Sequence, residues 1–390
     1  MTHSTDDRKA AFTFIVCLGL VSLFADMTYE GAYSGIGPFL DQLGLTAAQV
    51  ALIAGFGEMV SASLRYFTGK LADRTRAYWT IAGLGYFLNL VSIPGLAFVH
   101  TAGMAAVLIV LERTGKAMRG PARDVLLSEA TEVVGHGKGF GIHGAMDQIG
   151  AVIGPLFVAW AVARSTNFAP AFLYLGGPAF LALAALFLAH HVRPNKGTPP
   201  KPKPPQPLPR VFWLYVVASG ILAFGFFDFP LLGFHFQHTQ LFAPQTIPLL
   251  YAGAMGVVGL TAFVCGHLFD RHGIPVLVVG VLATMFALPL GFLGGQVGGA
   301  LAVMCWGAGL GVQDATLRSG IAQVVSMNKR GSAFGAFNGF FGVMWFIGSV
   351  IMGLLYDRSL VGLVAFGLVF QTLAAATFYW LRRPLAAVEH

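Results

Sequence analysis

Charged side chains within long apolar stretches are the residues of this sequence that can do chemistry. A charge at the centre of a bilayer costs on the order of 3 kcal/mol on insertion scales, so each one needs a partner or a functional reason to be there. Nine lie in the first half of the chain and three in the second. They are Asp26, Glu30, Glu58, Arg65, Glu112, Arg113, Lys116, Arg119, Asp147, Asp228, Asp314 and Arg318. This asymmetry predicts ion chemistry in the first half and an apolar wall in the phenylalanine-rich second half.

Asp26 and Glu30 are one helical turn apart, which places both carboxyl groups on one face of a helix. Burial and a neighbouring negative charge both favour the protonated form of a carboxyl group, so a proton can load and unload at such a site. We expect a proton or cation site here. The alternative is a structural pair of carboxylates held in ion pairs.

Four cations follow one another at spacings that place them within roughly one face of a helix. They are Arg113, Lys116, Arg119 and Arg123. From the rise of about 1.5 Å per residue, we expect Asp147 at the depth of Lys116, with Glu58 comparably deep. We favour a network of salt bridges between these groups; the alternative is a path for an anion.

The second half of the chain has a different set of polar candidates. Asp228 stands two residues before Pro230, where a helix break would free backbone carbonyls for a ligand. His235 and His238 have a spacing that can bind a metal. No cysteine or carboxylate accompanies them locally, so we favour polar lining of a cavity over a metal site.

The composition excludes a soluble enzyme as the default. Of 390 residues, 56% are hydrophobic and 11% charged, against about 25% charged in an ordinary soluble domain. The net charge of +7 is not gathered in a basic patch, which argues against a nucleic-acid partner. No nucleophile with its base and no phosphate-binding loop stands out, so we expect no enzyme, no cofactor and no metal. A membrane is the natural solvent for this chain.

Twelve stretches are long enough to cross a bilayer, which needs about 20 apolar residues per helix. They run near 11–40, 46–67, 78–99, 102–123, 139–163, 169–190, 210–237, 246–268, 274–294, 297–323, 332–356 and 360–381. Nearly all lysines and arginines near the ends of these spans fall on one side, and Arg164 and Arg358 fall on the other. Because cations are retained in the cytoplasm, we expect both termini there, in a bacterial inner membrane.

The spans divide into two related halves. Residues 194–209 read PNKGTPPKPKPPQPLP, a proline-rich linker between an N-terminal half, 1–193, and a C-terminal half, 210–390. The segment Gly69–Arg74, GKLADR, corresponds to Gly266–Arg271, GHLFDR. Phe140-Gly141 corresponds to Phe334-Gly335, and Asp26 to Asp228. Three matches in register indicate an internal repeat.

Twelve spans in two halves, with G-x-L-x-D-R after spans two and eight, resemble the major facilitator superfamily. The resemblance implies an all-α membrane fold of two pseudo-symmetric six-helix halves. In that family this loop latches one conformation. The resemblance assigns this latch role to Gly69, Asp73, Arg74, Arg76, Asp270 and Arg271. The glycine that continues the family's loop signature is missing here, where Thr75, Arg76 and Ala77 follow.

Span five resembles the antiporter signature of drug-efflux branches of the superfamily. It contains Gly141, Gly150, Gly154 and Pro155 at the matching spacing, although Val158 stands where that signature has its final glycine. Glycines one turn apart form a groove for close helix packing, and a proline permits a bend. Arg113 resembles a second superfamily motif, an arginine in the middle of span four that is tied to substrate or proton coupling.

The resemblance implies a monomeric secondary transporter with protons, a small-molecule substrate and membrane lipid as partners. We expect proton-coupled efflux of small amphipathic compounds by alternating access. Proton coupling is assigned to Asp26, Glu30, Glu58 and Asp147, and substrate contact to Arg113, Phe227, Asp228, His235, Asp314, Phe337 and Phe341. One alternative is transport of an organic anion or metal-chelating metabolite along the cations of span four. Another is a membrane receptor that transports nothing.

Overall fold

The computed structural model describes residues 5–192, 208–325 and 330–386, and within these ranges all the secondary-structure elements that form are helices, joined by short turns and loops. The predicted linker, 194–209, lies almost wholly outside the described residues. The helices form two bundles of six spans. This confirms the predicted all-α fold, since each span matches one predicted stretch within a few residues, apart from longer ends.

The first bundle begins with a long helix and ends with a span made of two consecutive helices. Its elements are α1 (Thr5–Gln42), α2 (Ala47–Thr75), α3 (Tyr78–Gly95), η1 (Leu96–Phe98), α4 (Ala102–Val134), α5 (His136–Ser165), α6 (Phe168–Tyr174) and α7 (Gly176–His191). The α6 and α7 helices together make the sixth span.

The second bundle begins with a broken span. Its elements are α8 (Arg210–Phe224), α9 (Phe229–His238), α10 (Thr246–His272), α11 (Pro275–Leu293), α12 (Gly295–Val324), α13 (Arg330–Arg358) and α14 (Leu360–Ala386). The α8 and α9 helices are separated by a short non-helical segment and together make the seventh span.

Eleven spans among the described residues are long and apolar enough to cross a membrane. The α4 helix is the twelfth and is less apolar than the others, because Glu112, Arg113, Lys116 and Arg119 follow one another along it. It packs between α2 and α3 and also contacts α1 and α5. Its charges therefore meet protein rather than lipid.

Helix ends extend beyond the apolar stretches on one side of the bundle. The segment Gly69–Arg74, predicted as a loop, lies in the last turns of α2, and Asp270 and Arg271 lie in α10. That part of the prediction was wrong because the chain stays helical through polar residues until a cap stops it. In α2 the stop is Arg76, whose left-handed backbone (φ 56°) returns its N–H to the Ala72 carbonyl.

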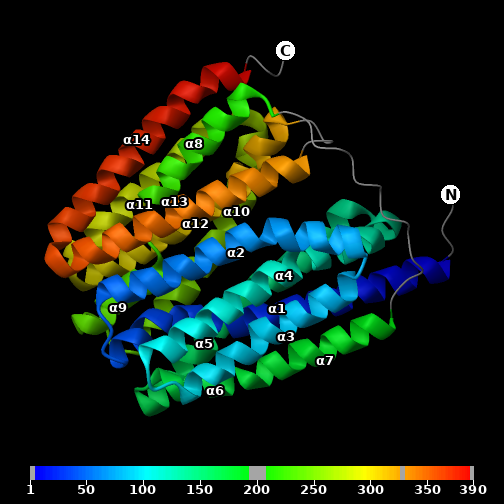
Figure 1. Cartoon of the computed structure of the whole chain (residues 1–390), viewed down its shortest axis with the longest axis horizontal. Coiled ribbons are helices and arrows are strands. Elements are labelled where there is room, and N and C mark those ends of the chain that lie inside the picture. The colour runs from blue at the N-terminus through cyan, green and yellow to red at the C-terminus, as the bar shows by residue number, and fades with distance from the viewer. Residues whose placement is uncertain (1–4, 193–207, 326–329, 387–390) are drawn as a thin grey trace.

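The two bundles lie side by side and converge toward one end (Figure 1). We call the end where α1 starts and α14 finishes the terminal end, and the end that holds α9 the far end. Across the two bundles, α1 packs on α9, α2 on α13 and α5 on α10. The helices spread apart toward the terminal end (Figure 1).

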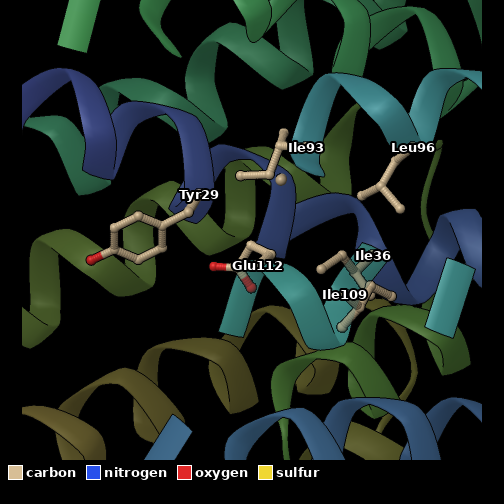
Figure 2. Close-up of a pocket in the computed structure, with 7 residues that line it drawn as sticks. Tyr29, Ile36, Ile93, Leu96, Ile109 and Glu112 are labelled. Atoms are coloured by element: carbon tan, nitrogen blue, oxygen red, sulfur yellow. The ribbon is translucent and has the colours of Figure 1, made fainter. Parts of the chain in front are cut away.

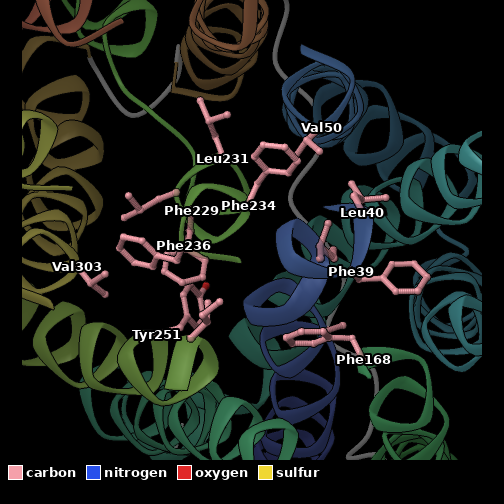
Figure 3. Packing of buried hydrophobic residues seen from close by; sticks show 14 of the residues in the cluster. Phe39, Leu40, Val50, Phe168, Phe229, Leu231, Phe234, Phe236, Tyr251 and Val303 are labelled. Carbon is pink, nitrogen blue, oxygen red and sulfur yellow. The ribbon is translucent and has the colours of Figure 1, made fainter. Parts of the chain in front are cut away.

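Apolar side chains from both bundles form the main core near the far end. Figure 3 shows this core, with Phe39 and Phe168 contributed by the first bundle and Phe229, Phe234 and Tyr251 by the second. Backbones also approach closely there, because Gly37 of α1 lies against the backbone of α9 with no room for a side chain. This core holds the far end of the two bundles together.

Candidate functional site

Cations of α4 pair with carboxylates of neighbouring helices in a polar ladder through the first bundle. The N···O distances are 3.2 Å for Arg113–Glu58, 3.9 Å for Lys116–Glu30, 3.7 Å for Arg119–Asp26 and 3.9 Å for Arg123–Asp147. The carboxylates come from α1, α2 and α5. The predicted salt-bridge network is therefore present, and each cation of the α4 face has a counter-charge.

The predicted depth of Asp147 was wrong by about two helical turns. Asp147 faces Arg123, and Lys116 faces Glu30 of α1 instead. The rise per residue fixes depth only relative to where a helix starts, and α5 begins at His136, while α4 continues to Val134. Equal offsets from the predicted span ends therefore do not correspond to equal depth.

Asp26 and Arg119 form the most buried rung of the ladder, with 4% and 3% of their side chains exposed. The guanidinium of Arg119 lies over the rings of Tyr29 and Tyr86, 5.0 and 4.8 Å from their centroids. Two of its nitrogens and one Asp26 oxygen have no hydrogen-bond partner. The pair is thus held by charge and aromatic contact, with hydrogen-bonding capacity left over.

The carboxyl groups of Asp26 and Asp147 lie close enough to interact directly. Ser22 donates a hydrogen bond to Asp147 at 2.5 Å and accepts one from Arg123 at 3.3 Å. Two carboxyl groups in contact repel one another when both are ionised.

Glu30 connects the two bundles. Tyr251 of α10 donates a hydrogen bond of 2.5 Å to Glu30 of α1. The ammonium of Lys116 lies over Tyr29, 4.1 Å from the ring centroid. A change of charge at Glu30 would therefore be felt by both bundles.

Arg113 differs from the other cations of α4 in pairing with a second carboxylate that is buried and comes from its own helix. Arg113 pairs with Glu112 at 3.2 Å in addition to Glu58, and Asn89 donates to Glu112 at 2.7 Å. Figure 2 shows Glu112 beside Tyr29 in a narrow pocket that is otherwise apolar. Arg113 therefore has two carboxylate partners.

The break in the seventh span follows the prediction. Residues 225–228 are not helical, and Asp228 accepts hydrogen bonds from Trp345 at 2.7 Å and Ser349 at 2.9 Å, both of α13. Trp306 donates to the freed Phe227 carbonyl, and Gln371 donates to that of Gly225. Sequence reasoning missed Tyr251, Trp306 and Gln371, whose only signal was a polar group inside an apolar span.

The remaining second-bundle candidates lie in different places. His235 contacts the Tyr356 hydroxyl at 2.9 Å, and His238 pairs with Asp41 of α1 at 2.8 Å, so the two histidines face different partners. The described residues contain no cluster of metal-ligating side chains. Phe227 and Phe337 are both buried, and Phe337 stacks on Phe341 with ring centroids 5.4 Å apart. Asp314 and Arg318 of α12 are exposed.

The glycines of α5 divide into two groups. Gly150 and Gly154 lie against the α1 backbone at Leu23 and Met27, which confirms the predicted packing groove. Gly141 faces open space. Pro155 lies inside α5, which continues through it.

The predicted latch residues make few contacts with the other bundle. Asp73 accepts a hydrogen bond of 3.1 Å from Tyr78 of its own bundle. Gly69 lies beside Pro121 of α4. Arg74, Asp270 and Arg271 are exposed. The latch stays a prediction.

Sequence comparison identifies the family. The profile of the Major Facilitator Superfamily matches residues 16–349. An uncharacterized protein of Mycobacterium tuberculosis (strain H37Rv) is 38% identical over 98% of this chain and 96% of its own length. An uncharacterized MFS-type transporter of Methanocaldococcus jannaschii is 22% identical over 92% of each chain. A multidrug resistance protein, MdtH of Aeromonas hydrophila, is 28% identical over 38% of this chain and 36% of its own.

Solved structures with the same fold include the nucleoside transporter NupG (TM-score 0.72, 14% identity, 97% of this chain and 100% of that one). A bacterial homolog of the human lysosomal transporter Spinster, in an inward-facing conformation, gives a TM-score of 0.71 with 15% identity over 99% of each chain. The chain belongs to the Major Facilitator Superfamily. It is a multi-pass integral membrane transporter and not an enzyme.

Proposed function

We propose that the protein is a proton-coupled secondary transporter that exports small amphipathic compounds by alternating access. The observation that carries the proposal is the Asp26 centre. There a buried carboxyl group contacts both a guanidinium and a second carboxyl group, one turn from the Glu30–Tyr251 link between the bundles. A proton taken up by this centre weakens its ion pairs, and the Glu30 link can pass that change to the other bundle.

Two features support export from the cytoplasm. The partial similarity to a multidrug resistance protein suggests an efflux substrate, and the packed glycines of α5 match the antiporter-like spacing. Cations gather at the terminal end, where Lys70 and Arg74 lie near the end of α2, Arg271 near the end of α10 and Arg382 near the end of α14. By the positive-inside rule the terminal end lies in the cytoplasm, in keeping with a bacterial inner membrane. The protein is proposed to act as a monomer.

The experiment is a proton-flux assay on purified protein in proteoliposomes that enclose a pH-sensitive dye. An imposed proton gradient is followed while naphthalene compounds with a trimethylammonium, hydroxymethyl or sulfonate group are added in turn. We expect compound-dependent proton flux in the wild type and its loss in Asp26→Asn. Glu132→Gln, at an exposed position of the same α4 helix, is the matched control and should keep the flux. A wild type without flux for any compound would overturn the proposal.

A further inference from the structure

Two arginines differ from every cation of the α4 ladder. Arg65 of α2 and Arg318 of α12 come from opposite bundles and lie close enough for their charges to repel one another. Among the described residues, neither has a carboxylate oxygen within 4.0 Å, whereas Arg113, Lys116, Arg119 and Arg123 all do. An arginine stays charged at any pH a cell meets, so this repulsion is not relieved by loss of a proton.

The surroundings of Arg65 leave a hydrogen-bond donor unused. Its Nε is buried and has no hydrogen-bond partner in the structure. Gly120 of α4 lies beside that nitrogen, since a Cβ built on this glycine would be 3.9 Å from the Nε. Because glycine has no side chain, this position of α4 does not cover the Arg65 Nε. A buried donor without an acceptor is destabilising, and an oxygen of a bound anion would supply the missing acceptor.

The surroundings of Arg318 are open. Arg318 is exposed, and so is Asp314 one turn earlier on α12. Asp314 interacts with both arginines at longer range, but a single carboxylate leaves the cluster with a net positive charge. Glu58 and Asp124 act on Arg65 only at a distance, since Glu58 pairs with Arg113 and Asp124 with Arg123.

An apolar surface adjoins the two arginines. Phe337 of α13 packs in the same cluster as Leu317 and Ile321, which flank Arg318 on α12. Phe341 stacks on Phe337. At the start of α13, Gly335 lies against Tyr66, the neighbour of Arg65. The two arginines therefore adjoin an aromatic pair of the second bundle.

We propose that Arg65 and Arg318 bind the anionic head of an amphipathic substrate, such as a carboxylate or sulfonate, whose apolar body lies toward Phe337 and Phe341. This inference rests on the proposed transport function and narrows its substrate class to organic anions. The anion would be held by both bundles at once, because each bundle supplies one arginine. The site is separate from the α4 cations, which are occupied by carboxylates.

The test is calorimetric binding of naphthalenesulfonate to the full chain in lipid nanodiscs, compared with the trimethylammonium and hydroxymethyl analogues. We expect the wild type to bind the sulfonate most tightly. Arg65→Gln and Arg318→Gln should each weaken it by about tenfold or more, the scale of a charge-assisted hydrogen bond. Arg318→Lys should lose less, and Arg358→Gln, an exposed arginine at the far end, should lose nothing.

Several outcomes would overturn the site. They are a wild type that does not bind the sulfonate, one that binds the cation as tightly, and unchanged sulfonate affinity in the two glutamine variants. If Arg65→Gln fails to fold, the Gln and Lys variants of exposed Arg318 still test the site. Asp26→Asn separates the two proposals, because it should bind the sulfonate normally while losing proton flux. Binding with no flux in the wild type would reject coupling and keep the site.

Discussion

Arg119 illustrates how a buried charge in this protein depends on one partner. It lies between Tyr29 and Tyr86, and Asp26 is the carboxylate with which it forms an ion pair. Removing one member of a buried pair leaves the other charge without compensation, at a cost of about 3–5 kcal/mol. The rung therefore contributes to folding as well as to the proposed chemistry.

We predict that Arg119→Leu lowers the thermal unfolding midpoint of the protein in detergent, because Asp26 is then buried alone. Adding Asp26→Asn to that variant should restore part of the loss, since no charge is left unpaired. Unfolding followed by tryptophan fluorescence measures both. Arg358→Gln at an exposed site is the control. Equal midpoints for Arg119→Leu and the double variant would show that the pair is not coupled.

The sequence identified the charged residues of the site and missed most of their partners. The cost of a buried charge singles out Asp26, Glu30 and Arg113 without a structure. A hydroxyl or indole group carries no such cost, so Tyr251 and Trp306 look like ordinary packing residues in an apolar stretch. Their roles appear only when the second bundle is placed beside the first.

At the scale of elements, the contact between α1 and α5 depends on two glycines. Gly150 and Gly154 lie directly on the α1 backbone, close to Asp26. The helix spans were predictable because bilayer thickness sets their length. Helix ends were less predictable because caps such as Arg76, rather than hydropathy, stop the helix.

We predict that Gly154→Val destabilises the protein by about 1–3 kcal/mol, the usual cost of overpacking. It should also reduce proton flux, because α1 carries Asp26 and Glu30. Gly141→Val in the same helix meets open space and should leave the unfolding midpoint nearly unchanged. Equal losses in the two variants would mean that helix propensity, and not the α1 contact, accounts for the effect.

The break between α8 and α9 frees backbone carbonyls, and it depends on side chains that donate hydrogen bonds to them. We predict that Trp306→Phe destabilises the protein by about 1–3 kcal/mol, because the buried Phe227 carbonyl loses its donor. Trp213→Phe, at a half-exposed position of α8, should have little effect. Thermal unfolding of the two variants in detergent makes the comparison. Similar midpoints would show that the break does not need this hydrogen bond.

At the scale of the whole molecule, the two bundles are joined at the far end by polar contacts as well as by the apolar core. His238 of α9 pairs with Asp41 of α1, and the Ala48 N–H donates to Asp357 of α13 at 3.2 Å. Exposed pairs of this kind contribute about 0–1 kcal/mol each. They can bias a conformational equilibrium without locking it.

We predict that Asp41→Asn combined with Asp357→Asn makes the far end open more often, by up to about thirtyfold if both contacts are lost. Labelling of a cysteine placed at Val50, which is buried in the main core at the far end, would be faster in this variant. Glu132→Gln at the terminal end is the control. Unchanged labelling would mean that the apolar core alone keeps the far end closed.

The central claim is that protonation at Asp26 shifts the balance between two arrangements of the bundles. Spin-label distances measure it directly in a variant whose Cys17, Cys265 and Cys305 are replaced. One pair, His100→Cys with Val297→Cys, reports on the far end. The other, Glu132→Cys with His267→Cys, reports on the terminal end. All four positions are exposed.

We expect two populations of the protein. In one the far-end distance is long and the terminal-end distance is short, and in the other the reverse holds. The ratio of the two populations should change with pH and should be shifted in Asp26→Asn. Distances at both ends that stay the same at every pH and in Asp26→Asn would contradict the central claim.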